Sequence, residues 1–266
     1  MISILIIVPT LNSYKLLPPL VDSLKSQTLD TWRVIFIDGP SNKAHRTWLE
    51  FVCLHDPRFQ WVAQNDTEGG IFGAMNQGFS IAEHTNDWLL FWGSDDRAAS
   101  PSCLEEAARK LMICDKASDI PDILVCSGIY FSSRNSHNII KTRDYTRTSR
   151  FAWRSSYISS LFYGSTPPHQ ATLIGPGARS RQNKYDTSYL LAADLNYFLN
   201  LSKFSDIKVL VHDLDLVLMG DSGISAKQSK RRLREVMRAY RQRFGLKWWI
   251  PFLLRYVQRI QSAFRL

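Results

Sequence analysis

The chain has 266 residues, of which 45% are hydrophobic and 21% charged, as in an ordinary globular protein. No stretch reaches the roughly 20 apolar residues of a membrane-spanning helix, and the apolar run after Met1 lacks the basic start of a signal peptide. The four cysteines form no CxxC pair and have no His at metal-site spacing. This excludes the usual Cys-ligated metal sites and predicts reduced, mostly buried thiols.

The net charge of +9 is concentrated near the carboxyl terminus. Residues 227–266 contain twelve Lys and Arg against one acidic residue, Glu235, and carry +11, so residues 1–226 carry −2. A nearly neutral body with a basic tail predicts a main domain over residues 1–226 and an appendage over residues 227–266. We expect the appendage to meet an anionic surface.

The first half of the chain alternates buried strands with amphipathic helices. We expect strands at residues 2–8, 32–37, 59–63 and 88–92, and helices at residues 14–26, around 48–52, up to about 83 and at 101–114. Four such alternations with short connections predict right-handed βαβ units and a parallel sheet.

Polar side chains follow three of these strands at the point where each strand ends. Thr10 and Asn12 follow the first strand, Asp38 ends the second, and Asp95 with Asp96 follow the fourth. Ligands of such sheets bind beyond the carboxyl ends of the strands. We therefore expect these five residues to converge on one site.

The pair Asp95–Asp96 comes shortly after the apolar run 88–92. Two adjacent carboxylates at the end of a buried strand repel each other and lose hydration. A divalent cation that carries a phosphorylated ligand would offset that cost, because hard cations prefer oxygen ligands. The alternative is that one of the two carboxylates caps the helix that opens near Pro101.

The second half of the chain is less regular. Residues 132–166 are expected to form hairpins and a mobile loop, and residues 220–225 a loop. The other expected elements are strands at 123–130, 207–211 and 214–219, a turn at 167–172 that leads into a short strand, and a helix over 191–199.

Several short motifs along residues 2–225 resemble the family-2 glycosyltransferases of the GT-A fold, closest to the branch that builds bacterial surface polysaccharides. These motifs are Val8-Pro-Thr-Leu-Asn12, Ile37-Asp-Gly39, Gly70 to Gly78, Gly93-Ser-Asp-Asp96, Pro168-His-Gln-Ala171, Tyr185-Asp186, Ala192-Ala-Asp194 and Gly220 to Ser225. The resemblance implies a Rossmann-like α/β domain whose mixed sheet is flanked by helices, followed by a C-terminal amphipathic helical appendage.

The resemblance also implies an activity and a set of roles. Such enzymes move a sugar, typically a hexose, from a nucleotide-diphosphate donor to an acceptor hydroxyl with inversion, and depend on a metal. By position, Asp194 would be the catalytic base, and Mg²⁺ or Mn²⁺ would be held by Asp96 and Asp95, with the share of each carboxylate left open. Donor-binding residues would be Pro9, Thr10, Asn12, Asp38, Gly70, Asn76 and Asp95, and His169 and Gln170 would line the donor–acceptor junction.

Each of these residues also has a plainer interpretation. Asp38 suits a turn at a strand end, and Gly70 suits a turn or close helix packing. Asn76 could be an ordinary helix residue. Asp194 could face solvent on its helix, and His169 could be structural.

The tail is predicted to form two helices separated by Gly245. On the second helix, apolar residues such as Phe252 and Val257 share one face, while Arg255 and Gln258 share the other. These features, with adjacent tryptophans, are typical of a helix lying in a membrane interface. We expect an enzyme at the cytoplasmic face of the membrane with a glycan or lipid-linked acceptor. The alternatives are packing on the domain or an oligomer contact.

Two rival functions remain. A non-catalytic protein of the same fold would bind a nucleotide sugar or act as a scaffold. A nucleic-acid-binding protein would use the basic tail, but the body lacks an interleaved aromatic and basic platform. We therefore expect no nucleic-acid partner.

Overall fold

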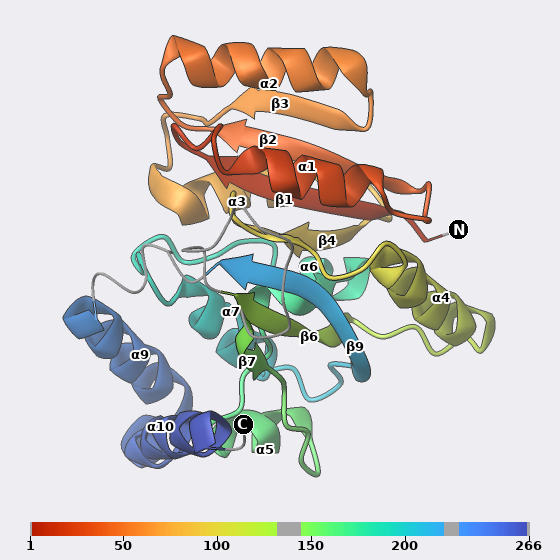
Figure 1. The fold of residues 1–266 in the computed structure, drawn as a ribbon. Coiled ribbons are helices and arrows are strands. Elements are labelled where there is room, and N and C mark those ends of the chain that lie inside the picture. Colours follow the sequence, from red (N-terminus) through yellow and green to blue (C-terminus); the bar gives the residue numbers. More distant parts are fainter. Residues whose placement is uncertain (1, 132–144, 221–228, 265–266) are drawn as a thin grey trace.

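The protein forms a mixed sheet flanked by helices, as predicted (Figure 1). A computed structural model describes residues 2–131, 145–220 and 229–264. The strands are β1 (Ile4–Thr10), β2 (Trp32–Asp38), β3 (Phe59–Ala63), β4 (Trp88–Phe91), β5 (Arg97–Ala98), β6 (Ile123–Phe131), β7 (Tyr145–Ser149), β8 (Thr172–Ile174) and β9 (Val209–Gly220). The helices are α1 (Leu17–Lys25), α2 (Lys43–His55), α3 (Gly70–Ile81), α4 (Cys103–Lys116), α5 (Tyr157–Phe162), α6 (Pro176–Arg181), α7 (Ala193–Leu201), α9 (Ser229–Phe244) and α10 (Trp249–Phe264), with 3₁₀ turns η2 (His169–Ala171) and η3 (Gly245–Lys247).

The strand order is β3-β2-β1-β4-β8-β6-β9-β5, and β7 pairs with β6 off this path. The first four strands are parallel, as predicted. Strand β8 runs antiparallel between β4 and β6, and β9 is parallel to β6. Strands β1, β2, β4, β6 and β9 therefore point their carboxyl ends to the same edge of the sheet.

Strand β1 lies at the centre of the packing because both of its faces are covered. Successive side chains of a strand point to opposite faces. Ile4, Ile6 and Val8 pack with the apolar side chains of α1, α2 and α4, whereas Leu5 and Ile7 pack with those of α3, α7 and α9. All five are fully buried, which explains the unbroken apolar run at the start of the sequence.

Three parts of the second half differ from the prediction. The two strands expected at 207–211 and 214–219 form one strand, β9, because the polar pair His212–Asp213 lies on a solvent-facing part of it. Strand β5 and helices α5 and α6 were not expected, since each has only two to six residues and too few for a readable period. Hairpins and a mobile loop were expected at residues 132–166, of which 132–144 lie outside the described residues and the rest contains β7, paired with β6, and α5. Most of the loop expected at 220–225 also lies outside the described residues.

The basic tail packs against the rest of the protein through α9. Gly245, with φ of +55°, ends α9 as predicted. Val236, Ala239 and Tyr240 of α9 are buried in the cluster that contains the apolar side chains of α7. The division of the chain at residue 226 stays a prediction.

Helix α10 is turned differently from the expectation. Its Arg255 and Gln258 face the protein, where they donate hydrogen bonds to Thr166 Oγ1 (2.6 Å) and the Tyr163 carbonyl (2.7 Å). The tail instead exposes apolar side chains, namely Leu246, Trp249, Leu253 and Val257. The apolar side chains of α10 can be buried, and its polar side chains can form hydrogen bonds with the protein. The sequence pattern alone therefore does not determine which face of the helix contacts the protein. In the described part of the chain, no helix is long and apolar enough to cross a membrane.

Helix α3 lies unusually close to β1 at Gly78. A Cβ atom there would lie 2.7 Å from Ile7 Cγ1, a fully buried side chain. We expect Gly78→Ala to lower the free energy of unfolding by about 1–3 kcal/mol, because overpacking outweighs the better helix propensity of alanine. Denaturant unfolding measures this. Ser80→Ala, at an exposed position of the same helix, is the control and should change stability little.

Candidate functional site

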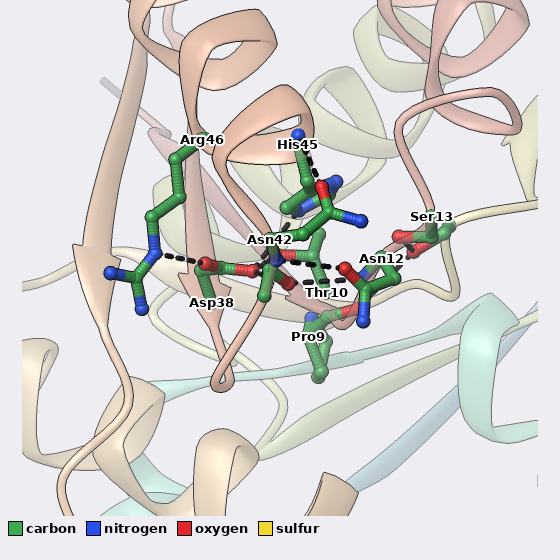
Figure 2. Close-up of polar contacts among 10 residues, drawn as sticks. Pro9, Thr10, Asn12, Ser13, Asp38, Asn42, His45 and Arg46 are labelled. Atoms are coloured by element: carbon green, nitrogen blue, oxygen red, sulfur yellow. Dashed lines mark hydrogen bonds and ion pairs between the residues drawn. The ribbon is translucent and has the colours of Figure 1, made fainter.

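The carboxylate of Asp38, at the end of β2, is buried among polar side chains from three elements (Figure 2). Its Oδ1 accepts hydrogen bonds from Thr10 Oγ1 (3.0 Å) and Ser41 Oγ (2.6 Å). Arg46 Nε lies 3.4 Å from Oδ2, and His45 Nε2 lies 3.0 Å from Oδ1. Burial lowers the pKa of His45, against the raising effect of Asp38. One negative charge at this strand end is therefore held by several donors.

Asn12 joins the loops that follow β1 and β2. It has φ of +52°, a left-handed conformation that asparagine tolerates better than most residues. Its Oδ1 accepts from the backbone N–H of Asn42 (2.9 Å), and its own N–H donates to Ser41 Oγ (2.9 Å). Asn42 in turn caps α2. The Pro9 carbonyl accepts from Ser94 Oγ (3.3 Å), which ties this corner to the loop after β4.

The sequence reading missed Ser41, His45 and Arg46. Only their position in the sequence could have indicated them. Ser41 lies in the loop after a buried strand, and His45 and Arg46 lie in the first turn of the next helix, where hydrogen-bond donors can reach the strand end. His45 was hidden because a lone histidine on a helix has no distinctive spacing.

Asp95 and Asp96 lie together in the loop after β4. Asp96 is 3% exposed, and its Oδ2 accepts from the backbone N–H of Gly93 (2.6 Å). Burial and the charge of Asp95 raise the pKa of Asp96 well above its usual value, although backbone N–H groups of Gly93 and Gly220 oppose the shift. A Cβ on Gly220 would clash with the Asp95 carboxylate, so β9 ends directly against this pair.

The donor set at this loop fits a hard divalent cation. Two adjacent carboxylates supply oxygen atoms, and a cation would relieve the repulsion that disfavours ionised Asp96. Among the described residues, no third acidic, His or Cys side chain joins them. Asp221, which follows Gly220, lies outside the described residues.

Asp194 occupies the first turn of α7 near His169 and Tyr185. Burial lowers the pKa of His169, and the negative charge of Asp194 opposes this; burial raises the pKa of Tyr185, and the charge of Asp194 adds to this. His169 Nε2 lies 2.7 Å from the Tyr185 hydroxyl, and the His169 ring stacks on Phe91 at 5.6 Å. The charge of Asp194 therefore reaches a histidine that packs on β4, the strand that leads to Asp95 and Asp96.

Gln170 meets the site through its backbone. Its carbonyl accepts a hydrogen bond from Trp92 Nε1 (2.9 Å). This bond fixes the His169–Gln170 turn against the end of β4.

Glu235 of α9 holds the segment just before Asp194. Its buried carboxylate accepts hydrogen bonds from the backbone N–H groups of Leu190 (3.2 Å), Leu191 (2.8 Å) and Ala192 (3.1 Å). A carboxylate at this position also suits the positive end of α7. Glu235 was read in the sequence only as the single acid of a basic tail, so its role was missed.

Gly70 and Asn76 lie on α3 at the edge of the site. Gly70 has φ of +79°, which requires glycine. Asn76 is buried, and its amide bonds both backbone groups of Tyr185, at 2.7 Å and 3.1 Å, and Glu68 at 2.6 Å. These contacts favour the structural interpretation of Asn76. It also borders a hollow of about 330 Å³ with Glu68 and Lys184.

The fold resembles solved glycosyltransferase structures. S. aureus TarS in complex with UDP-GlcNAc has a TM-score of 0.64 at 16% identity, covering 92% of this chain and 68% of that one. A mannosyltransferase from Pyrobaculum calidifontis, PcManGT, in complex with GDP-Man and Mn²⁺, has a TM-score of 0.63 at 14% identity, covering 99% and 73%. The expected GT-A fold is thereby confirmed.

Sequence comparisons agree with the fold. A PGL/p-HBAD biosynthesis glycosyltransferase of Mycobacterium bovis BCG is 26% identical over 216 residues, which cover 80% of this chain and 74% of that protein. Residues 5–178, well over half of the chain, match the family described as glycosyl transferase family 2. With the strand-end site at the expected edge of the sheet, the chain belongs to glycosyl transferase family 2.

Proposed function

We propose that this glycosyltransferase moves a sugar from a nucleotide-diphosphate donor to an acceptor hydroxyl with inversion, with Asp194 as the base. The observation that carries the proposal is that the charge of Asp194 reaches His169, whose ring stacks on Phe91 of β4, the strand from which Asp95 and Asp96 follow. An inverting transfer needs the base on the face of the sugar opposite the departing diphosphate. The place of Asp194 on a separate later element, α7, supports that role.

The donor's nucleoside is proposed to bind at the ends of β1 and β2. Thr10, Asn12 and Asp38 form a connected polar cluster there through Ser41, and Pro9 links it to the loop after β4. Gly70 and Asp95 would complete the donor site, and Asn76 would support it through its hydrogen bonds to Tyr185. The complexes of TarS with UDP-GlcNAc and of PcManGT with GDP-Man support a nucleotide-sugar donor.

Asp96 and Asp95 are proposed to hold Mg²⁺ or Mn²⁺. When bound, such an ion neutralises charge that develops on the departing diphosphate. The Mn²⁺ in the PcManGT complex supports this choice of ion.

The remaining chemistry belongs to side chains of this chain. Asp194 accepts the proton of the acceptor hydroxyl as it attacks. His169, whose pKa is lowered by burial, stays neutral at pH 7 and is held by the Tyr185 hydroxyl. A neutral His169 lines the junction of donor and acceptor without adding a positive charge there, and Gln170 shares the junction.

The acceptor is proposed to be a glycan or a lipid-linked molecule in surface polysaccharide or glycolipid assembly. The name of the mycobacterial relative supports a glycolipid. The exposed side chains Leu246, Trp249, Leu253 and Val257 and the positive tail suit an anionic membrane surface at its cytoplasmic face. An oligomer formed through the same surface is the alternative.

A non-catalytic protein of the same fold is the rival function. It would bind nucleotide sugars without turnover. Asp194 separates the two proposals, because a binding protein has no need of a base beside the donor.

Asp194→Asn should lower kcat by about 10²–10⁴-fold, because the amide cannot accept the proton. Binding of the nucleotide should stay within about twofold, since Asp194 lies on a different element from the donor residues. Steady-state transfer kinetics and calorimetric titration with UDP or GDP measure the two effects. Unchanged kcat with an intact melting temperature would refute the role of Asp194.

Binding of Mn²⁺ should strengthen with pH. Folding raises the pKa of Asp96, so protonated Asp96 stabilises the native state at low pH, and this stabilisation is lost as pH rises through the folded pKa. The cation binds only the ionised carboxylate. Below that pKa, affinity should rise up to about tenfold per pH unit for one released proton. Titration with Mn²⁺ in the presence of UDP or GDP at several pH values measures this. Asp96→Asn should abolish the dependence; an unchanged Mn²⁺ affinity in that variant would contradict the proposed site.

The double variant Trp249→Ser/Leu253→Ser should lose co-sedimentation with vesicles of phosphatidylglycerol and phosphatidylcholine, because it removes apolar area that would enter the interface. The matched control is Phe51→Ser/Leu54→Ser, which removes similarly exposed apolar side chains from α2. Equal sedimentation of both variants and the unmodified protein would rule out docking through α10.

A further inference from the structure

Helix α10 places a guanidinium group inside the protein, at Arg255. Its Nη1 donates to Thr166 Oγ1 (2.6 Å), and the residue keeps part of its surface accessible. Its Nε is buried and has no hydrogen-bond partner among the described residues. The neighbouring hydroxyl of Tyr240 is likewise buried, and it raises the pKa of Arg255 through its charge and a side-chain hydrogen bond. No well-aligned hydrogen bond among the described residues engages either Arg255 Nε or the Tyr240 hydroxyl, so these two polar groups lie side by side and only weakly paired.

Among the described residues, no close acidic side chain neutralises the charge of Arg255. Arg255 takes part in none of the ion pairs within 4.0 Å that the described residues form. Burial lowers its pKa, but Tyr240, Asp194 and Tyr256 outweigh this and raise the pKa, so the group stays positive. A part-buried cation held mainly by neutral groups is costly unless an anion joins it.

Arg255 cannot easily swing away from this position. Gly164, with φ of +85°, lies so close to α10 that a Cβ there would be 2.7 Å from the Leu254 carbonyl carbon. One turn later, Gln258 Nε2 donates to the Tyr163 carbonyl (2.7 Å). The helix is therefore held against residues 163 and 164 both at Arg255 and one turn later.

The location of Arg255 points to the acceptor rather than the nucleotide. Thr166 lies three residues before His169, and the charge of Asp194 reaches both His169 and Arg255. The nucleotide side, with Thr10 and Asp38, is at the ends of β1 and β2, whereas α10 packs with α5 and α9 on the other side of the fold (Figure 1). Arg255 thus belongs to the side of the site that holds the base.

We propose that Arg255, with Thr166 and Tyr240, binds a phosphate-type anion carried by the acceptor and so turns the acceptor hydroxyl towards Asp194. The proposal rests on the proposed transferase function and names the class of its second substrate. Arginine suits this role because its planar donors match phosphate oxygens. The anion could belong to a lipid phosphate or to a phosphorylated glycan.

The test is calorimetric titration of the full chain with three probes: farnesyl phosphate, farnesol and inorganic phosphate. Arg255→Gln should weaken the binding of farnesyl phosphate by about tenfold or more, because a charge-assisted hydrogen bond is lost. Arg255→Lys should recover part of the affinity. Farnesol binding should be the same in all variants.

Gln258→Ala is the matched control, since it removes a docking bond of α10 and keeps the charge. It should leave the affinity for farnesyl phosphate within about twofold, and melting temperatures verify that each variant is folded. If Gln258→Ala weakens binding as much as Arg255→Gln does, Arg255 acts only through the position of α10 and the proposal fails.

Titration with UDP or GDP separates this inference from the proposed function. If the unmodified protein binds neither nucleotide, the transferase proposal fails. If Arg255→Gln weakens the binding of UDP or GDP as much as the binding of farnesyl phosphate, the anion belongs to the donor and the inference is wrong. Where the inference holds, tighter binding of farnesyl phosphate than of inorganic phosphate assigns a lipid phosphate, and equal binding assigns a free phosphorylated acceptor.

Discussion

The carboxylate of Glu235 accepts hydrogen bonds from three consecutive backbone N–H groups, and the position of the chain before α7 depends on it. A buried carboxylate is unfavourable unless such donors compensate it, and N–H groups that precede a helix need an acceptor. Each group thus satisfies the other. Through this contact α9, which comes late in the sequence, positions the start of α7, and the first turn of α7 carries Asp194. The tail is consequently part of the site's framework as well as a charged surface.

The other two buried carboxylates of the site are compensated in different ways. Asp38 is surrounded by hydroxyl groups and the cationic Arg46, so its charge is balanced within the fold. Asp96 is buried and lies beside Asp95, and both effects disfavour its ionised form although backbone N–H groups donate to it. This contrast is the physical reason for proposing a cation at Asp96 and none at Asp38. The charge of Asp38 is compensated by protein groups, whereas the charge of Asp96 would be compensated by a bound cation.

The parts of the fold that the sequence predicts are those that depend on local pattern. Unbroken apolar runs identify β1, β2 and β4 because such strands are covered on both faces. The polar residues after them lie at one edge of the sheet because the three strands are parallel. Glu235 and Arg255 were not placed because their partners lie about 45 and 90 residues away. On an amphipathic helix both look like surface charges. Only the packing of α9 and α10 decides which charges turn inward.

The origin of the Glu235 contact in the last part of the chain has a consequence for synthesis. A chain that leaves the ribosome from its amino terminus can pair β1 to β4 early, since these strands and their helices are contiguous in sequence. The backbone N–H groups of residues 190–192, before α7, remain exposed to water until α9 has left the ribosome. Nascent chains would thus acquire the nucleotide side of the site before the side that carries Asp194. The segment that carries Asp194 is thus completed only after α9 has been synthesised.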